Sequence, residues 1–132
     1  MKIQMVVRGI CCLKAGVPGE TDNIEVISVV GRFLEHSRIY IFGKGEEAKV
    51  YIASADFMTR NTVKRVEVAA PVYDEGLKRK LIDDFMLYLS DDVKARQQMG
   101  GVYTRRGIMD GIESKGINSQ ETLYSRAYER AK

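Results

Sequence analysis

The chain has one histidine, His36, which stands beside Glu35 and two residues before Arg38 in a polar stretch between apolar segments. An imidazole titrates near neutral pH, so it can give or take a proton during a reaction and can bind an anion when it is protonated. A single histidine is more often a surface or hydrogen-bonded structural residue. The charged neighbours of His36 favour the functional interpretation.

Two arginines stand where strand ends are expected. Arg8 follows an apolar, β-branched run and precedes Gly9, whose missing side chain lets another group approach the backbone closely. Arg65 opens a later run of the same kind. A guanidinium stays charged and its planar fork of donors matches phosphate oxygens, so the two arginines and His36 suit an anion with several oxygens. Ordinary surface ion pairs are the alternative.

A further polar segment, residues 54–61 with the sequence SADFMTRN, combines hydroxyl, carboxylate and amide groups after an expected strand. Loops at strand ends often present such groups to substrates, and Asp56 and Asn61 are candidates for orienting a histidine. The same residue types are also common in plain turns. A zinc site is excluded, because the lone histidine has no histidine or cysteine partner at ligand spacing.

Strands are expected in the first half of the chain. Residues 3–7 form a β-branched run, and residues 24–30 fit either a buried strand or the start of a short helix that extends to residue 34. Residues 38–42 and 49–54 predict a hairpin around Gly43-Lys44-Gly45. That turn is not a phosphate-binding loop, because Gly45 stands where the motif requires Ser or Thr.

The second half predicts one more strand, at residues 65–72, and two helices. Asp74 is the expected N-cap of the first helix, and its apolar stripe is expected to pack as core on the sheet. The stripe consists of Leu77, Leu81, Ile82, Phe85, Met86 and Leu89. Gly100-Gly101 interrupts the chain, residues 103–117 are expected to be irregular, and residues 118–131 form a helix with Asn118 and Glu121 spaced as a capping box. These elements predict an α/β fold with a mixed sheet.

Size and charge fit a single domain over residues 1–132. The chain is 45% hydrophobic and carries a net charge of +3. Residues 1–93 hold 13 basic and 14 acidic side chains, whereas residues 94–132 hold 8 and 4. This basic tail is expected to be a solvated surface or, less often, a contact to an anionic ligand or a neighbouring domain.

The two cysteines, Cys11 and Cys12, are adjacent, so a bridge between them would be strained and a reducing compartment is expected. No apolar run is long enough to span a bilayer, and Met1 leads directly into a strand-like pattern rather than a signal segment. The chain is therefore expected to be soluble and cytoplasmic.

Five blocks of the sequence together resemble the C-terminal domain of bacterial polyphosphate kinases. The blocks are RGICC at residues 8–12, VGRFLEHSR at 30–38, SADFMTRN at 54–61, RVEV at 65–68 and VKAR at 93–96. The resemblance covers residues 1–96 and leaves residues 97–132 as a C-terminal tail with a terminal helix. It implies a fold similar to phospholipase D in a single copy, which is a mixed β-sheet with flanking helices.

The resemblance also implies a function. In that family the terminal phosphoryl group of ATP passes reversibly to inorganic polyphosphate through a phosphohistidine, and that residue belongs to a preceding domain absent from this chain. His36 matches the family's second histidine, implied to contact the nucleotide phosphates and to protonate the leaving oxygen. Arg8 and Arg65 match its phosphate-contacting arginines. Alone, this chain is expected to be inactive.

The implied ligands are ATP or ADP, polyphosphate and Mg²⁺, with the magnesium ligands outside this chain. The preceding domains of the same enzyme are further partners, and the full enzyme is expected to be a homo-oligomer. Nucleic acid is not expected as a partner under this interpretation.

Two alternatives stay open. One is a stand-alone polyanion or nucleic-acid binder that uses the basic tail with Tyr124 and Tyr128. The other is a phosphodiesterase dimer similar to phospholipase D, in which two copies of His36 meet. The phospholipase signature H-x-K-x-x-x-x-D is degenerate here, because Arg38 and Gly43 replace its lysine and carboxylate, so lipid hydrolysis is not expected.

Overall fold

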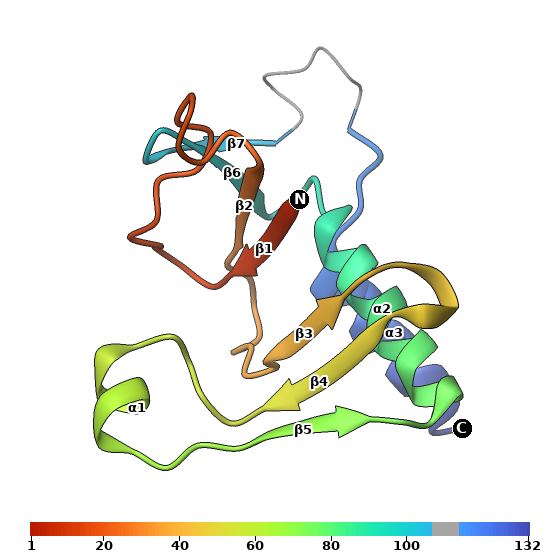
Figure 1. The fold of residues 1–132 in the computed structure, drawn as a ribbon. Coiled ribbons are helices and arrows are strands. Elements are labelled where there is room, and N and C mark those ends of the chain that lie inside the picture. Colours follow the sequence, from red (N-terminus) through yellow and green to blue (C-terminus); the bar gives the residue numbers. More distant parts are fainter. Residues whose placement is uncertain (107–113) are drawn as a thin grey trace. The chain divides into compact units, whose positions relative to one another are not determined.

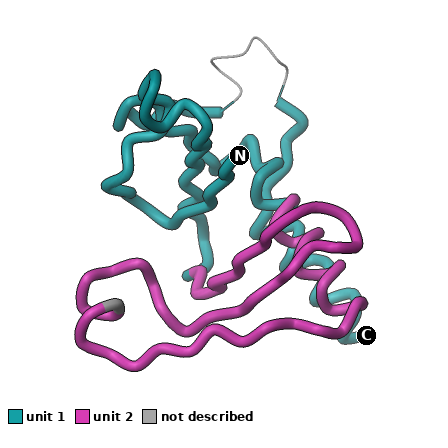
Figure 2. Tube along the Cα trace, in the orientation of Figure 1, with its two compact units in different colours: residues 1–34, 87–132 teal, residues 35–86 magenta. Residues whose placement is uncertain are grey.

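The computed structural model describes residues 1–106 and 114–132, which form two compact units. Residues 1–34 and 87–132 make up the first unit, and residues 35–86 make up the second (Figure 2). Each unit contains its own β-sheet (Figure 1). The predicted α/β class is confirmed, with the strands divided between two sheets rather than joined in one.

The sheet of the first unit has four strands in the order β1-β2-β6-β7. Strand β1 (Ile3–Val7) runs parallel to β2 (Ile24–Val29), and β2 pairs antiparallel with β6 (Ala95–Met99). Residues 24–29 are thus a strand and not a helix. Their β-branched side chains fit a central strand, and Val26 and Ile27 are completely buried there.

Strand β7 (Val102–Arg105) forms a hairpin with β6, and the prediction of irregular structure from residue 103 is wrong for this strand. Gly100 and Gly101 make the turn with φ angles of 56° and 91°, which other residues rarely adopt. The sequences ARQQM and VYTR have too few apolar residues to mark strands by themselves. Part of the expected irregular segment, residues 107–113, lies outside the described residues.

The sheet of the second unit is antiparallel and has the order β3-β4-β5. Strands β3 (Ile39–Phe42) and β4 (Lys49–Ala53) form the predicted hairpin, with a short 3₁₀ helix, η1 (Gly45–Glu47), in its turn. Strand β5 (Ala69–Val72) begins later than predicted. Its partner β4 ends at Ala53, which is paired with Ala69, so residues 65–68 have no strand beside them. The prediction that Arg65 opens a strand is therefore wrong.

The described residues also form three α-helices, and one of them, α1 (Thr59–Lys64), is absent from the sequence-based prediction. Helix α2 (Glu75–Leu89) begins after Asp74, whose side chain accepts a 2.8 Å hydrogen bond from the N–H of Leu77, which confirms the N-cap. Helix α3 (Ser119–Arg130) begins after Asn118, which accepts from the N–H of Glu121 as predicted. None of the helices in the described residues is long and apolar enough to cross a membrane.

Only part of the apolar stripe of α2 is buried. Leu89 is buried, but Leu77 and Met86 are 56% and 54% exposed, so the prediction of a packed stripe is wrong at these two residues. A helix of 15 residues is about 22 Å long, whereas strands of four or five residues extend roughly 13 to 17 Å. The stripe is longer than the strands of the second unit.

A buried carboxylate, Asp91, joins the elements of the first unit. One of its oxygens accepts hydrogen bonds from the N–H groups of Val93, Lys94 and Ala95 at 2.7 to 3.1 Å, and the other accepts from the N–H and hydroxyl of Ser119. Burial alone would raise the pKa of Asp91, but the hydrogen bonds from Ser119, Lys94 and Ala95 outweigh it and lower the pKa. Asp91 thereby fixes where β6 and α3 begin.

Replacing Asp91 by Asn is expected to lower the free energy of unfolding by about 2–4 kcal/mol, because an amide offers one acceptor oxygen to donors that now share two. The stabilisation by Asp91 is complete above its unfolded pKa of about 3.9 and is lost as the pH falls through the lower pKa of the folded state. Urea denaturation of the chain between pH 2 and 7 measures both effects. An unrelated surface substitution is expected to change the free energy of unfolding by no more than about 0.5 kcal/mol.

The matched control is Asp83→Asn, which removes an exposed carboxylate from α2. An Asp91→Asn variant as stable as this control, with the same acid dependence as the unaltered chain, would contradict the role given to Asp91.

Candidate functional site

Most of the predicted site residues of the second unit lie at one end of its sheet. Because the sheet is antiparallel, the start of β3, the end of β4 and the start of β5 lie at the same end of the sheet. His36 precedes β3, residues 54–61 follow β4, and Arg65 lies four residues before β5. The topology thus collects polar segments that are far apart in the sequence.

A charged pair connects two of these segments. Arg38 Nε donates a 2.8 Å hydrogen bond to Asp56 Oδ1, and its Nη1 donates to the main-chain carbonyl of His36 at 3.1 Å. The bond to Asp56 raises the pKa of the Arg38 guanidinium, which stays charged. The main-chain oxygen of Asp56 accepts from Met58 N and Asn61 Nδ2. Asp56 is therefore linked through Arg38 to the backbone of His36, and its orienting role stays a prediction.

The His36 side chain is exposed. Among residues 1–106 and 114–132, its imidazole has no hydrogen-bond partner, while its backbone is held by Arg38. A ring that is held at its backbone and open at both nitrogens can meet a ligand without first breaking an internal bond. This geometry suits a residue that binds an anion or transfers a proton.

Arg65 is also exposed, and it follows the last residue of α1 in an extended conformation with φ of −127°. It makes no ion pair within the described part of the chain. The segment after it is tied to the end of β4. Ser54 donates its hydroxyl to Glu67 and accepts from Val68 N, and Ser54 N donates to Val68 O at 3.0 Å. These bonds hold the backbone that carries Arg65.

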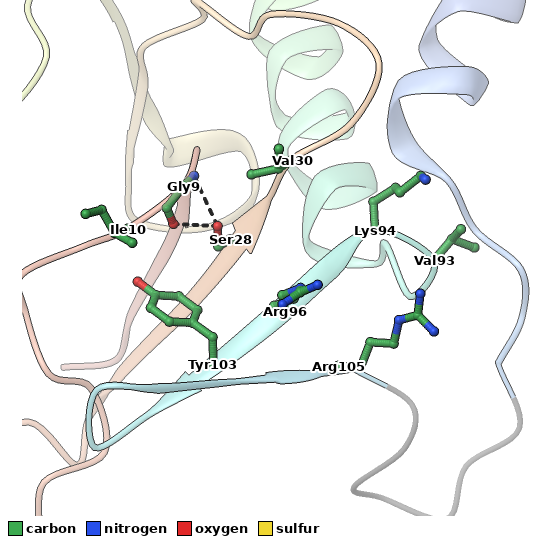
Figure 3. Close-up of a pocket in the computed structure, with 9 residues that line it drawn as sticks. All are labelled: Gly9, Ile10, Ser28, Val30, Val93, Lys94, Arg96, Tyr103 and Arg105. Atoms are coloured by element: carbon green, nitrogen blue, oxygen red, sulfur yellow. Dashed lines mark hydrogen bonds between the residues drawn. The ribbon is translucent and has the colours of Figure 1, made fainter.

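Arg8 belongs to the first unit, at the end of β1. The next residue, Gly9, has a φ of 88° and exchanges two hydrogen bonds with the buried side chain of Ser28 on β2. Gly9 N donates to Ser28 Oγ at 3.1 Å, and Ser28 Oγ donates to Gly9 O at 2.6 Å (Figure 3). A hydroxyl in the central strand therefore sets the direction in which the chain leaves Arg8.

The loop that follows is held by Gln98, which is 3% exposed. Its Oε1 accepts from Ala15 N at 2.7 Å, and its Nε2 donates to Cys11 O and to the hydroxyl of Tyr103. That hydroxyl also accepts from Cys11 N at 2.8 Å. Ser28, Gln98 and Tyr103 are not among the residues predicted from sequence. A serine and a glutamine inside strands are nevertheless a detectable signal, because buried polar side chains need hydrogen-bond partners.

A hollow of about 420 Å³ lies beside Arg8, and it is lined also by Arg32 and Phe33. Gln120 on α3 positions this wall, because its side-chain amide accepts from Phe33 N at 2.9 Å and donates to Phe33 O at 2.8 Å. The Phe33 ring stacks on Tyr124, which stacks on Tyr128. The two tyrosines considered above for nucleic-acid binding thus stack on each other, and Tyr124 also stacks on Phe33.

Within the described ranges, no group of three histidine, cysteine, aspartate or glutamate side chains is placed to hold a metal ion. The candidate groups are the guanidinium of Arg8 in the first unit and the imidazole of His36 and the guanidinium of Arg65 in the second. Each of them can bind oxygens of an anion, and the imidazole can also transfer a proton.

Comparisons with known proteins agree on one family. Residues 1–120 match the family model described as polyphosphate kinase C-terminal domain 2. The chain is 55% identical over 125 residues to a polyphosphate kinase of Staphylococcus saprophyticus, of which it covers 17%, while 93% of the chain is aligned. It is 48% identical to the polyphosphate kinase of Staphylococcus epidermidis, with 96% of the chain and 17% of that protein aligned.

A solved structure is also similar. The crystal structure of polyphosphate kinase from Porphyromonas gingivalis superposes with a TM-score of 0.83 and 35% identity, over 98% of this chain and 19% of that one. The family indicated by the five sequence blocks is confirmed. The chain spans less than a fifth of the length of these relatives.

The bond between Ser28 and Gly9 leads to a local prediction. Ser28→Ala removes the acceptor of Gly9 N, so the Gly9 amide should exchange its hydrogen about five- to tenfold faster, as one net hydrogen bond of roughly 1 kcal/mol implies. Site-resolved hydrogen exchange measures this rate. Ser90→Ala, which removes an exposed hydroxyl that donates to Leu87 O, is the control. Unchanged exchange at Gly9 would refute the proposed brace.

Proposed function

The chain belongs to the polyphosphate kinase family, as its C-terminal domain 2, and we propose from this membership that it forms one part of a phosphotransferase active site. The reaction is the reversible transfer of the terminal phosphoryl group of ATP to inorganic polyphosphate. The histidine that carries the phosphoryl group lies in a preceding domain, outside this chain. The whole of residues 1–132 acts as one catalytic domain of the longer enzyme.

One observation carries the proposal: His36 has an exposed imidazole on a backbone held by the Arg38–Asp56 pair. An imidazole of this kind can donate a proton to the oxygen that leaves phosphorus when the bond between the β- and γ-phosphates of ATP breaks. The proton goes to the ADP oxygen, and the phosphoryl group goes to the nucleophilic histidine of the other domain. His36 is the acid in this step and is not phosphorylated itself.

Arg8 and Arg65 supply positive charge. Phosphoryl transfer spreads negative charge over the equatorial oxygens of the transferred group, and catalysis depends mainly on fixed cations and donors around them. Both guanidiniums are exposed, and side-chain hydrogen bonds brace the backbone near them, from Ser28 to Gly9 beside Arg8 and from Ser54 to residues 67 and 68 after Arg65. Such bracing reduces the reorganisation that binding a phosphate requires.

Mg²⁺ is the expected cofactor, and residues outside this chain hold it. When bound, it neutralises phosphate charge. ATP and ADP are the expected nucleotides, the compartment is the cytoplasm, and the complete enzyme is a homo-oligomer with a phospholipase D-like fold in this domain.

In the complete enzyme, His36→Ala, Arg8→Ala and Arg65→Ala should each lower kcat/KM for polyphosphate synthesis by roughly 10²-fold or more, as loss of one positioned donor does elsewhere. His36→Gln keeps a hydrogen-bond donor but cannot supply a proton at neutral pH. It should therefore retain the Kd for ATP and still lose kcat. Steady-state kinetics and nucleotide titration separate the two effects.

Arg79→Ala is the matched control, because Arg79 is an exposed arginine of α2 that no sequence block assigns to phosphate. It should leave kcat/KM unchanged. Full activity in both His36→Ala and Arg8→Ala, with the enzyme folded, would refute the proposed function.

A further inference from the structure

Three side chains form a row across the sheet of the first unit. Ser28 on β2 is paired with Arg96 on β6, and Arg96 is paired with Arg105 on β7. Directly paired residues of neighbouring strands project from the same face of a sheet. Figure 3 shows Ser28, Arg96 and Arg105 on these three strands. The row therefore consists of Ser28, whose hydroxyl is hydrogen-bonded to Gly9, followed by Arg96 and Arg105.

The loop after β1 makes a wall over the same face. Gln98 on β6 and Tyr103 on β7 are paired two residues away from Arg96 and Arg105, on the same face, and both are hydrogen-bonded to Cys11. A cavity of about 500 Å³ lies between the loop and the row. Its lining is shown in Figure 3 and consists of Gly9, Ile10, Ser28, Val30, Val93, Lys94, Arg96, Tyr103 and Arg105.

The described residues that line this cavity carry charge of one sign. They include three cations and no acidic residue, and Lys94, Arg96 and Arg105 make no ion pair with any residue of 1–106 or 114–132. Like charges directly opposite each other on paired strands disfavour folding. Arg96 and Arg105 are such a pair, so their placement costs stability and needs a reason other than the fold. An anion bound between them would offset the repulsion.

The cavity adjoins the hollow beside Arg8. Both are lined by Gly9 and Val30, so one ligand can extend from the Arg8 side to the Arg105 side without leaving the surface of this unit. All of these residues belong to the same compact unit. The basic excess of residues 94–132 therefore lies partly inside a cavity.

We propose that Lys94, Arg96 and Arg105 bind successive phosphates of a chain joined by anhydride bonds, continuing from the phosphate held by Arg8. This inference rests on the proposed function and extends it, because none of these three residues was assigned a role in the transfer. Guanidinium forks match phosphate oxygens in bidentate geometry, and the lysine adds a point charge. Lys94, Arg96 and Arg105 together form a linear binding surface for several phosphates, which we call the track.

The lining fits a phosphate chain better than a nucleic acid. Proteins that bind single strands stack the bases on exposed aromatic rings, and among the described residues that line the cavity the only aromatic ring is that of Tyr103, whose hydroxyl already bonds to Cys11 and Gln98. Two sources share the chemistry of the proposed ligand, free polyphosphate and the triphosphate of a nucleotide. Kinetics in the two reaction directions distinguish them.

The test compares R96Q/R105Q with R126Q/R130Q in the complete enzyme. Both variants lose two positive charges from the first unit, but Arg126 and Arg130 are exposed residues of α3 outside the cavity. If the track holds polyphosphate, R96Q/R105Q should raise the KM for long polyphosphate by about tenfold or more in ATP formation, with the KM for ADP unchanged. Titration calorimetry with long polyphosphate should show the same loss.

R96K/R105K, which keeps both charges, should recover part of this binding, and Lys94→Gln is a milder variant for the case that the double change prevents folding. A KM increase confined to ATP would assign the track to the nucleotide triphosphate. Unchanged KM values and unchanged titration in a folded R96Q/R105Q enzyme would overturn the proposal, as would loss of single-stranded DNA binding with polyphosphate binding intact.

The two proposals fail separately. An enzyme without phosphoryl transfer, or one whose activity survives His36→Ala and Arg8→Ala, refutes the proposed function. An active enzyme that needs Arg8 but is indifferent to R96Q/R105Q refutes the track alone.

Discussion

The first unit depends on a carboxylate that is completely buried. Asp91 accepts hydrogen bonds from the segment that begins β6 and from the first residue of α3, so its two oxygens join segments that are 24 residues or more apart. Burying a charge is costly unless its hydrogen bonds are all made. Here they are made by main-chain N–H groups at the start of β6 and of α3 and by the Ser119 hydroxyl. Without Asp91 these N–H groups would lose their hydrogen-bond acceptor. The start of β6 set in this way determines where Lys94 and Arg96 lie.

The same device recurs at each candidate site. A side chain hydrogen-bonds to the backbone at or near a candidate residue and leaves the candidate side chain exposed. Ser28 does this for Arg8, Arg38 does it for His36, and Ser54 does it for the segment after Arg65. Cationic groups cannot pack in an apolar core, so the protein fixes their backbone and keeps the charge accessible to an anion.

Polar residues inside strands are therefore the informative feature of this fold. Gln98 and Ser28 occupy positions on β6 and β2 where an apolar residue would fill the core, and each of them bonds to the loop after β1. A fully bonded polar network gives one arrangement of that loop rather than several. The cavity that contains Arg96 and Arg105 exists because this loop is held over the sheet.

The sequence by itself determined the local structure and the family. The strand at residues 3–7, the hairpin around Gly43 and the caps at Asp74 and Asn118 depend on neighbouring residues alone, and the sequence blocks identified the polyphosphate kinase family. It also led to the prediction that His36, Arg8 and Arg65 contact phosphate, from their chemistry and from that resemblance.

Only the tertiary structure decided the rest. The polar segments β6 and β7 are strands because β6 pairs with β2 and β7 pairs with β6, and β5 starts at Ala69 because β4 ends at Ala53. The row of Ser28, Arg96 and Arg105 joins residues up to 77 positions apart, a proximity that no local pattern contains. Strand pairing is a contact between distant segments, so its register appears only when both partners are in place.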